Sequence, residues 1–509
     1  MLADLPPEIQ SLVISFVPAN RDIAALSHQC RQLYSLCDLE LRQRFHRIKV
    51  TAKDEDIETV FNLLIEILKK PRLGTFVNHI ECPVLTTITH EWTGTPQRHL
   101  AEEEMNLVQS MVREAGFEGL EKERVVSMLL QKTAKVETSN ALDFAAYRYS
   151  KACETFISQA FVTSLMIVCP NLQSLAITLP FACYDPIYCP DIAMPLDLFL
   201  RRMLSIQMSP EPVPYLRQLR HVYFINLDKT GDGRSYVHLE FGGGMMLFGN
   251  LPSIESAATD AVELPDLEPP LPEESIDISK ICIKHSSLNS NYLVRLILMP
   301  RVLKEFRYSV GGRESIEGGY PMFNPKAVIK ALCGHKQRLQ TLDVDVEGEC
   351  LPFQLKEEDW EAEMDSHGSA WDLGEDEEMI KLIKRVWSRS GSLQDFVALK
   401  YLSLSINFLL YLAKGVSGEP DEKCEKRPLV DCLPPKLEHI CVRGYKRGVN
   451  EDHDAQMDAL VSLCESGLST LKTIEGVKKV IPNAVTIEDI DEDGDLLWKS
   501  KYESSDYES

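Results

Sequence analysis

The chain has 509 residues, of which 44% are apolar and 26% are charged, and its formal net charge is −23. This composition supplies enough apolar residues for a core and is not typical of a wholly disordered chain. An acidic chain repels nucleic acid and anionic membranes unless a basic patch compensates, and only short pairs such as Arg201-Arg202 are found. We therefore expect neither nucleic acid nor a membrane as a partner.

The cysteines and the N-terminus indicate an intracellular protein. The 14 cysteines are scattered singly without a Cys-x-x-Cys pair, which argues against structural zinc and against a secreted disulfide scaffold. Asp4, Pro6, Pro7 and Glu8 stand where a signal peptide has a basic start and an apolar run. No apolar stretch reaches the roughly 20 residues that span a bilayer as a helix. We expect a soluble protein of the cytoplasm, the nucleus or both.

The first predicted element is a helix that follows Leu5. Pro7 suits the first turn of a helix, and Pro18 would end it. Between them, apolar residues recur with the spacing i, i+3, i+4, i+7 and i+8, which places them on one face. These residues are Ile9, Leu12, Val13, Phe16 and Val17.

Two further helices are predicted within the first forty residues. Asp22 can cap one that contains Ile23 and Leu26. The other is predicted over 29–37, with Leu33, Tyr34 and Leu36 facing inward. Three short helices cannot bury a sufficient core on their own. We therefore expect their apolar faces to be covered by the rest of the chain or by a partner subunit.

The order of these residues resembles the F-box motif. The matching segments are Leu5-Pro-x-Glu-Ile, Ile14-Ser-Phe-Val-Pro, Asp22-Ile and Ser27-x-x-Cys30-Arg31-x-Leu-Tyr34, with Tyr34 where many members have Trp. In that family the helices bind the Skp-type adaptor, which connects to cullin and RING subunits. The resemblance implies an apolar adaptor-binding or supporting surface made by Leu5, Pro6, Ile9, Val13, Ile14, Phe16, Val17, Ile23 and Leu26. The alternative is a helical cap that closes a repeat array.

Downstream of these helices the phrase Leu-x-x-Φ-x-Φ recurs, where Φ is apolar. Many copies follow a helical segment, such as 293–299 or 327–332. Each helix–strand unit leaves an apolar face open, and stacking the next unit closes it. From Leu172 onward, with the weaker copy at Ile254 counted, the intervals of about 35–60 residues are too long and uneven for a regular leucine-rich repeat without insertions. Clear copies begin at Leu172, Leu219, Leu303, Leu339, Leu399 and Leu437, and weaker ones at Leu73, Ile254 and Leu471.

Arranged in this way, the chain resembles the divergent leucine-rich-repeat F-box proteins that are common in fungi. The predicted fold class is α/β, with a short helical F-box followed by an irregular leucine-rich-repeat-like solenoid. The predicted parts are an F-box over 1–45, the array over 46–480 and an acidic tail over 481–509. Insertions are expected at 100–152 (helical and charged), 255–275 (a Pro- and acid-rich loop) and 354–376 (an acidic linker). The alternative is an ordinary α/β domain with parallel strands.

The strands of such an array would carry the target-binding residues. In a curved solenoid the strands line the concave side, and residues between the buried apolar positions face outward. We therefore expect an exposed protein-binding surface there. It would contain Tyr223, Arg307, Asp343, Asp345, Ser403, Ser405 and Arg443, together with Ser309 and Cys441.

No motif points to chemistry performed by the chain itself. Gly-x-Ser-x-Gly and His-Glu-x-x-His motifs do not occur. Asp489-x-Asp491-x-Asp493 imitates a calcium loop, but Ser500 stands where the bidentate Glu is needed. We therefore expect no catalytic residue, metal or cofactor, and predict the substrate-recognition adaptor of a Skp–cullin–F-box ubiquitin ligase. The alternatives are a leucine-rich-repeat scaffold without a ligase role and a hydrolase with a Cys nucleophile.

Overall fold

The computed structural model places most of the chain in two compact units. The described residues are 5–15, 17, 20–51, 54–83, 97–132, 157–178, 195–225, 239, 241–262, 271–286, 288–310, 323, 325–346, 385–416, 427–467 and 469–484. The first unit consists of Met1–Ala176, Cys183–Arg202 and Pro212–Leu219. The second consists of Ile177–Ala182, Met203–Glu211 and Arg220–Ser509.

Eleven described strands form a sheet whose spatial order is the chain order, β1 to β11. The pair β1–β2 and every pair from β4 to β11 are parallel. Parallel neighbours need a crossover connection, and helices supply many of them here. The predicted α/β class is confirmed. The strands are β1 (Arg47–Lys49), β2 (His79–Cys82), β3 (Ser174–Ile177), β4 (His221–Phe224), β5 (Ser256–Asp260), β6 (Lys280–Lys284), β7 (Glu305–Ser309), β8 (Thr341–Asp345), β9 (Tyr401–Ser405), β10 (His439–Arg443) and β11 (Thr473–Glu475).

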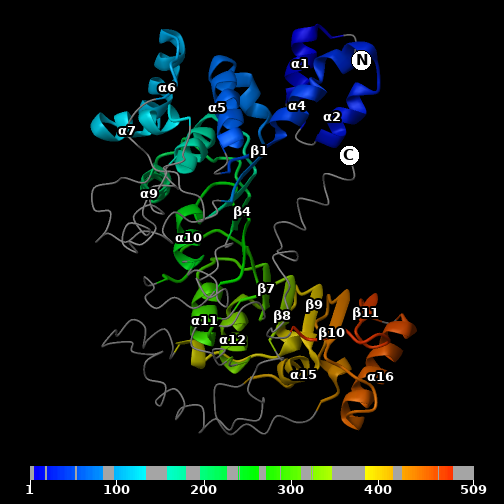
Figure 1. The fold of residues 1–509 in the computed structure, drawn as a ribbon. Coiled ribbons are helices and arrows are strands. Elements are labelled where there is room, and N and C mark those ends of the chain that lie inside the picture. Colours follow the sequence, from blue (N-terminus) through cyan, green and yellow to red (C-terminus); the bar gives the residue numbers. More distant parts are fainter. Residues whose placement is uncertain are drawn as a thin grey trace, which may run out of the picture. The chain divides into compact units, whose positions relative to one another are not determined.

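The first unit begins with short helices, of which Figure 1 labels α1, α2 and α4. They are α1 (Pro7–Ser15), α2 (Asn20–Ser27), α3 (Arg31–Leu36) and α4 (Leu39–His46). The three predicted N-terminal helices are therefore confirmed. They share a small core of Ile14, Ile23, Leu33 and Cys37. Leu33 is buried as predicted and Leu36 is half-buried against this core, but the prediction that Tyr34 faces inward is wrong, because Tyr34 is 60% exposed.

Longer helices complete the first unit. They are α5 (Asp54–Lys69), the 3-10 helix η2 (Pro71–Phe76), α6 (Glu102–Glu114) and α7 (Gly119–Leu129), and residues 157–168 are helical as well. The helices α6 and α7 confirm the helical prediction for the start of 100–152, whereas 133–152 lie outside the described residues. The α9 helix (Pro195–Gln207) contains residues of both units.

His79 in β2 is a buried histidine with a shifted pKa. Its residue is 6% exposed. Burial, followed by the nearby positive charge of Arg47, lowers the pKa of His79 from 6.5 to about 4, although Glu81 acts in the opposite direction. The folded chain therefore holds this imidazole neutral at pH values where an exposed histidine is protonated.

We expect the free energy of unfolding to fall on acidification because of His79. Between pH 6.5 and about 4 the unfolded chain binds a proton that the folded chain does not, so stability is full above this window and is lost as pH falls through it. The loss is about 2 kcal/mol between pH 7 and pH 5. Urea unfolding of wild type and of His79→Asn at both pH values checks this. The same pH dependence in both proteins would contradict it.

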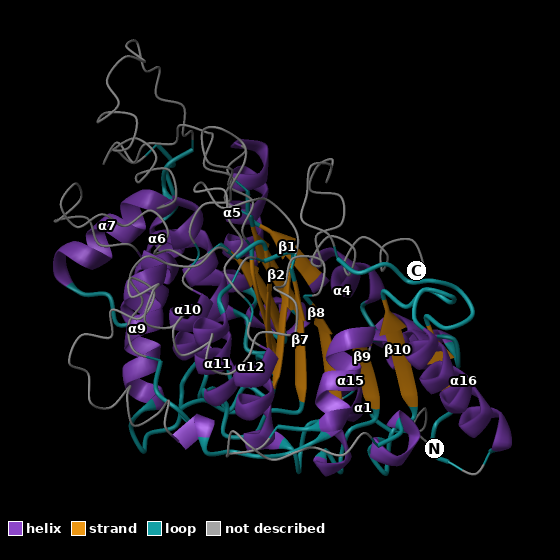
Figure 2. Cartoon of the chain, turned by 90° about the horizontal axis from the view of Figure 1, so that it is seen from below, coloured by secondary structure: helices purple, strands orange, loops and turns teal. Residues whose placement is uncertain are grey.

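In the second unit the strands lie side by side with helices along one face (Figure 2). Contacts of α10 with β4, of α15 with β9 and β10, and of α16 with β11 join the two layers. The helices are α10 (Phe241–Phe248), α11 (Ser290–Leu298), α12 (Pro325–Leu332), α15 (Ile406–Lys414) and α16 (Glu451–Ser466), and the 3-10 helices are η3 (Cys333–His335), η4 (Leu393–Asp395) and η5 (Leu429–Cys432).

The ends of α16 illustrate how the sequence sets these elements. The side chain of Asn450 accepts hydrogen bonds from the backbone N–H groups of Asp452 and His453, and acidic residues in the first turn favour the positive end of the helix dipole. Gly467 ends the helix with φ at +65°, a conformation in which glycine has no Cβ penalty.

The recurring phrase predicts most of the strands. All six clear copies lie on strands, which are β3, β4, β7, β8, β9 and β10, and the weaker copies at Ile254 and Leu471 precede β5 and β11. Leu339, two residues before β8, and Leu342 and Val344 within it are all fully buried. The expectation that 255–275 is a loop is wrong at its start, because Ser256–Asp260 forms β5 between β4 and β6.

Besides β5, three strands use the same spacing with a first residue other than Leu. Phe45 stands before β1, Val77 before β2 and Ile278 before β6, and each is fully buried. The weak copy at Leu73 is wrong, because Leu73 lies in η2 and β2 follows Val77 instead. With Ile278 included, the phrase recurs after 24 and then 25 residues from Ile254 to Leu303. The intervals are therefore shorter here than the sequence suggested.

Candidate functional site

The α1 helix has an inner side that packs against α2 and α3 and an outer side that carries apolar residues. Ile14 lies in the core shared with α2 and α3, and Gln10 is buried on the same side. The outer side faces solvent, and the spacing i, i+3 and i+4 of Ile9, Leu12 and Val13 places these residues along one side of the helix. Ile9 (44% exposed), Leu12 (53%) and Val13 (38%), together with Leu5 (40%) just before the helix, are called the α1 outer stripe below.

The predicted adaptor-binding residues are thus divided between surface and core. Leu5, Pro6, Ile9 and Val13 are exposed, Val17 and Leu26 are half-buried, and Ile14 and Ile23 are buried in the helical core. Phe16 lies outside the described residues. Leu12 was not among the residues that the motif suggested, although its place in the stripe already marked it. Three exposed apolar residues on a helix that already has a core, with a fourth just before it, are a feature of interaction surfaces.

The second candidate site is the face of the sheet that carries polar side chains in the second unit. Strand register aligns its residues in rows across neighbouring strands. Along each strand these polar-face residues alternate with residues that are buried on the helix-covered face, such as Phe306, Leu342 and Leu402. The central row runs Tyr223, Ala258, Cys282, Arg307, Asp343, Ser403, Cys441 and Glu475.

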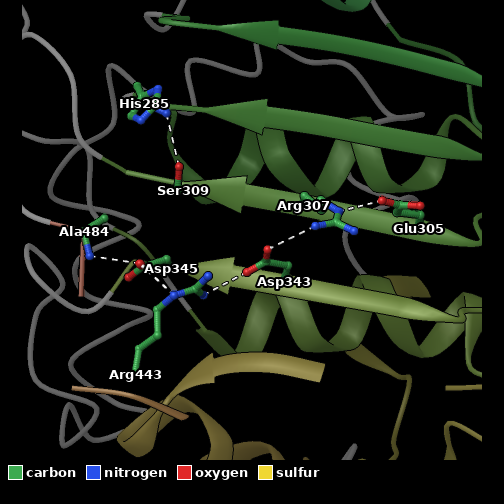
Figure 3. Close-up of polar contacts among 8 residues, drawn as sticks. All are labelled: His285, Glu305, Arg307, Ser309, Asp343, Asp345, Arg443 and Ala484. Atoms are coloured by element: carbon green, nitrogen blue, oxygen red, sulfur yellow. Dashed lines mark hydrogen bonds and ion pairs between the residues drawn. The ribbon is translucent and has the colours of Figure 1, made fainter. Parts of the chain in front are cut away.

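A network of charges crosses this polar face (Figure 3). Arg443 on β10 donates to Asp343 Oδ1 on β8 at 2.8 Å, and its Nε lies 3.3 Å from Asp345 Oδ2. Arg307 on β7 donates to Glu305 at 2.5 Å and lies 3.6 Å from Asp343 Oδ2. Asp343 therefore lies between two guanidinium groups from different strands.

The short side chains of β9 allow this network to form. Strand β9 lies between β8 and β10, so Arg443 must cross it to reach Asp343. In register with these two residues, β9 presents Ser405 and Ser403, whose small side chains leave room for a guanidinium to pass. Both serines are fully buried.

A segment that follows β11 returns to the same face. Gly444 N–H donates to the carbonyl of Ile481 at 2.8 Å, and Ala484 N–H donates to Asp345 Oδ2 at 2.9 Å. Residues 477–484, called the C-terminal strap below, thus contact β10 and β8. The strap begins after Gly476, whose φ of +82° sets the turn.

The prediction that this face is exposed is wrong for most of its residues. Arg307, Ser309 and Arg443 are half-buried, and the rest are buried: Tyr223, Asp343, Asp345, Ser403, Ser405 and Cys441. The sequence pattern identified the face correctly but not what covers it. The charge network and the C-terminal strap together remove its centre from solvent.

Another polar cluster lies at the carboxyl ends of β4, β5 and β6. The hydroxyl of Tyr223 donates to Asp260 Oδ2, and His285 Nδ1 lies 3.0 Å from Asp260 Oδ1. His285 has a φ of +50°, and its backbone N–H donates to Ser309 Oγ at 3.2 Å. Tyr223 is therefore held inside the sheet by a hydrogen bond and does not present its hydroxyl to a partner.

The described thiols on this face are poor nucleophiles. Burial raises the pKa of Cys282 to about 12, and burial also raises the pKa of Cys441. A thiol becomes reactive as its thiolate, so these environments oppose a role in catalysis. In the described part of the chain no group of three or more His, Cys, Asp or Glu could hold a metal ion. Asp489 to Asp493 lie outside the described residues.

Comparison with known proteins adds no relative. No protein-family model matches the chain, and no curated protein matches it in sequence. Across the described residues, no helix has both the length and the apolar character needed to cross a membrane. The chain is an α/β protein with a parallel sheet, and its candidate sites are the α1 outer stripe and the polar face of the sheet.

Proposed function

We propose that the chain is the substrate-recognition adaptor of a Skp–cullin–F-box ubiquitin ligase. In this proposal the N-terminal helices bind the Skp-type subunit, which leads to the cullin and RING subunits, and the sheet unit binds the target protein. The observation that carries the proposal is the α1 outer stripe, which belongs to the segment that resembles an F-box. Its Leu5, Ile9 and Val13 are also residues that the motif assigns to the adaptor-binding surface.

The arrangement of the helix trio supports a partner on this stripe. Ile14, Ile23 and Leu33 already fill the core between α1, α2 and α3, so the outer stripe is not needed to hold the three helices together. Covering a Leu or Ile side chain contributes roughly 1.5–3 kcal/mol, which makes such residues suitable anchors for a helical partner. A partner with an apolar groove would bury the stripe along its whole length.

The second unit is consistent with leucine-rich repeats as the target-binding part. Parallel strands in chain order, most of them introduced by Φ-x-x-Φ-x-Φ, are expected of repeats that stack on their neighbours. The intervals of 24 and 25 residues from Ile254 to Leu303 lie within the range of about 20–29 residues for leucine-rich repeats. On this reading Arg307 and Arg443 remain partly accessible to a target, while the buried Asp343 and Asp345 hold them in place.

The proposed mechanism is positional and needs no catalytic residue in the chain. Binding a target and the Skp-type subunit at once raises the local concentration of the target near the ubiquitin-carrying enzyme. Orientation of the two reacting groups supplies the rest of the acceleration.

We expect Ile9→Asp to abolish binding to the Skp-type subunit. The change places a carboxylate on the α1 outer stripe, where binding would bury it without a partner, and affinity should fall roughly 100-fold or more. Co-elution of the purified full chain with the purified Skp-type subunit measures this, with circular dichroism as a check of folding. Leu120→Asp is the matched control, because Leu120 is 71% exposed on α7 of the same unit and outside the proposed surface.

The outcome separates the proposal from its alternative. Equal binding of the Skp-type subunit by wild type, Ile9→Asp and Leu120→Asp would show that the α1 outer stripe does not take part in the interface. Wild type that does not co-elute with the Skp-type subunit would refute the ligase role and favour a protein-interaction scaffold.

A further inference from the structure

A pocket of about 650 Å³ lies at the amino ends of β5 to β8, on the second unit. Its charged lining consists of Lys280, Arg301, Lys304 and Arg338, with Glu255 and Asp277 as the acidic members, and it is called the basic pocket below. Its volume falls within the roughly 300–1,000 Å³ typical of small-molecule sites. Neither the sequence motifs nor the proposed ligase role accounts for it.

The acidic members of the basic pocket are already neutralised. Glu255 lies 3.2 Å from Lys280 Nζ and 3.6 Å from Arg220, and these cations lower the pKa of the Glu255 carboxyl although burial opposes them. Asp277 accepts a hydrogen bond from Arg301 at 2.6 Å. The two carboxylates are therefore occupied and do not repel an incoming anion as bare charges would.

Two cations in the pocket remain available. Within the part of the chain that the structure describes, no ion pair or side-chain hydrogen bond is recorded for Lys304 or Arg338. Both are exposed. Together they leave the pocket with two uncompensated positive charges in a chain whose net charge is −23. Lysine offers three donors and arginine a planar fork of donors, which is the chemistry that recognises phosphate oxygens.

We propose that the basic pocket binds a small molecule that carries phosphate groups. Lys304 and Arg338 donate to the phosphate oxygens, while Arg301 is held by Asp277 and Asn250 at the edge of the site. The net negative charge of the chain repels anions in general. Binding of an anion therefore depends on the cations that meet in the basic pocket. The proposal does not depend on the ligase role.

Pyrophosphate is the probe for this site. We expect titration calorimetry of the full chain at a constant ionic strength of about 0.15 M to show saturable binding of pyrophosphate. Lys304→Glu and Arg338→Glu should each weaken it roughly tenfold or more, because each removes charge-assisted hydrogen bonds. Lys446→Glu is the matched control, since Lys446 is an exposed lysine in a turn after β10 and outside the pocket.

Each other outcome overturns the proposal. No saturable binding by wild type would show that the pocket is only a solvated charged surface. Equal weakening by Lys446→Glu would show general attraction by charge rather than a site. Tighter binding of a phosphoserine hexapeptide than of pyrophosphate would assign the pocket to a protein ligand instead of a small molecule.

Discussion

Replacing Arg443 by Leu should lower the free energy of unfolding by about 3 kcal/mol. Arg443 is the cation that faces both Asp343 and Asp345, and each of these residues is 7% exposed. After the substitution Asp345 keeps the N–H of Ala484, and Asp343 keeps Arg307 at 3.6 Å. The loss therefore reflects carboxylates left in the sheet without their main counter-charge rather than the absence of one contact.

Urea unfolding followed by circular dichroism measures this loss, and Arg447→Leu is its control. Arg447 makes hydrogen bonds of 2.6 and 2.8 Å to Asp458, but both side chains are largely exposed. Solvent screens such a pair, so its removal should have little effect on stability. Similar losses in the two variants would contradict the structural role of the buried network.

A double substitution isolates the charge pair within the network. If Arg443 mainly neutralises Asp343, then Asp343→Asn combined with Arg443→Leu should cost less than the sum of the two single changes. Strict additivity would mean that Arg443 does not stabilise the sheet through Asp343, and would leave its contact with Asp345 and the packing of its aliphatic stem across Ser403 and Ser405 as the stabilising contributions.

The strands could be predicted from sequence because their buried positions follow a strict spacing. The first position of each phrase is buried and requires an apolar side chain, but that side chain need not be leucine. Phe45, Val77 and Ile278 occupy this position before β1, β2 and β6. A search restricted to leucine finds β7 and β8 and misses β1 and β6. Without Ile278 the intervals look longer than they are, and the Pro- and acid-rich composition of 255–275 hides β5 although the weaker copy at Ile254 precedes it.

The candidate sites were predicted less completely, because burial depends on partners that are distant in sequence. Periodicity places Ile9 and Ile14 on different sides of one helix, but only the packing of α2 and α3 decides that Ile14 is the buried one. Along β8, Asp343 and Asp345 alternate with buried apolar residues, and this alternation predicts that the two aspartates face solvent. They are nevertheless buried, because Arg443 and the strap residue Ala484 lie about 100 and 140 positions further along the chain.

Replacing Gly476 by Ala should release the C-terminal strap at a cost of about 3 kcal/mol. An added Cβ would lie 1.8 Å from the carbonyl oxygen of Val442, and φ at Gly476 is +82°. The chain after β11 must therefore move, which breaks the hydrogen bond between Gly444 and Ile481 and the one between Ala484 and Asp345.

Gly448→Ala separates backbone strain from displacement of the strap. Gly448 has nearly the same φ, +83°, but nothing lies within 4 Å of an added Cβ, so its substitution should cost only about 1 kcal/mol. Amide hydrogen exchange around Gly444 should accelerate in Gly476→Ala and stay unchanged in Gly448→Ala, because only the former loses the acceptor at Ile481. If both variants lose the same stability and exchange alike, the strap does not hold the polar face closed, and the burial of Asp345 must come from the charge network alone.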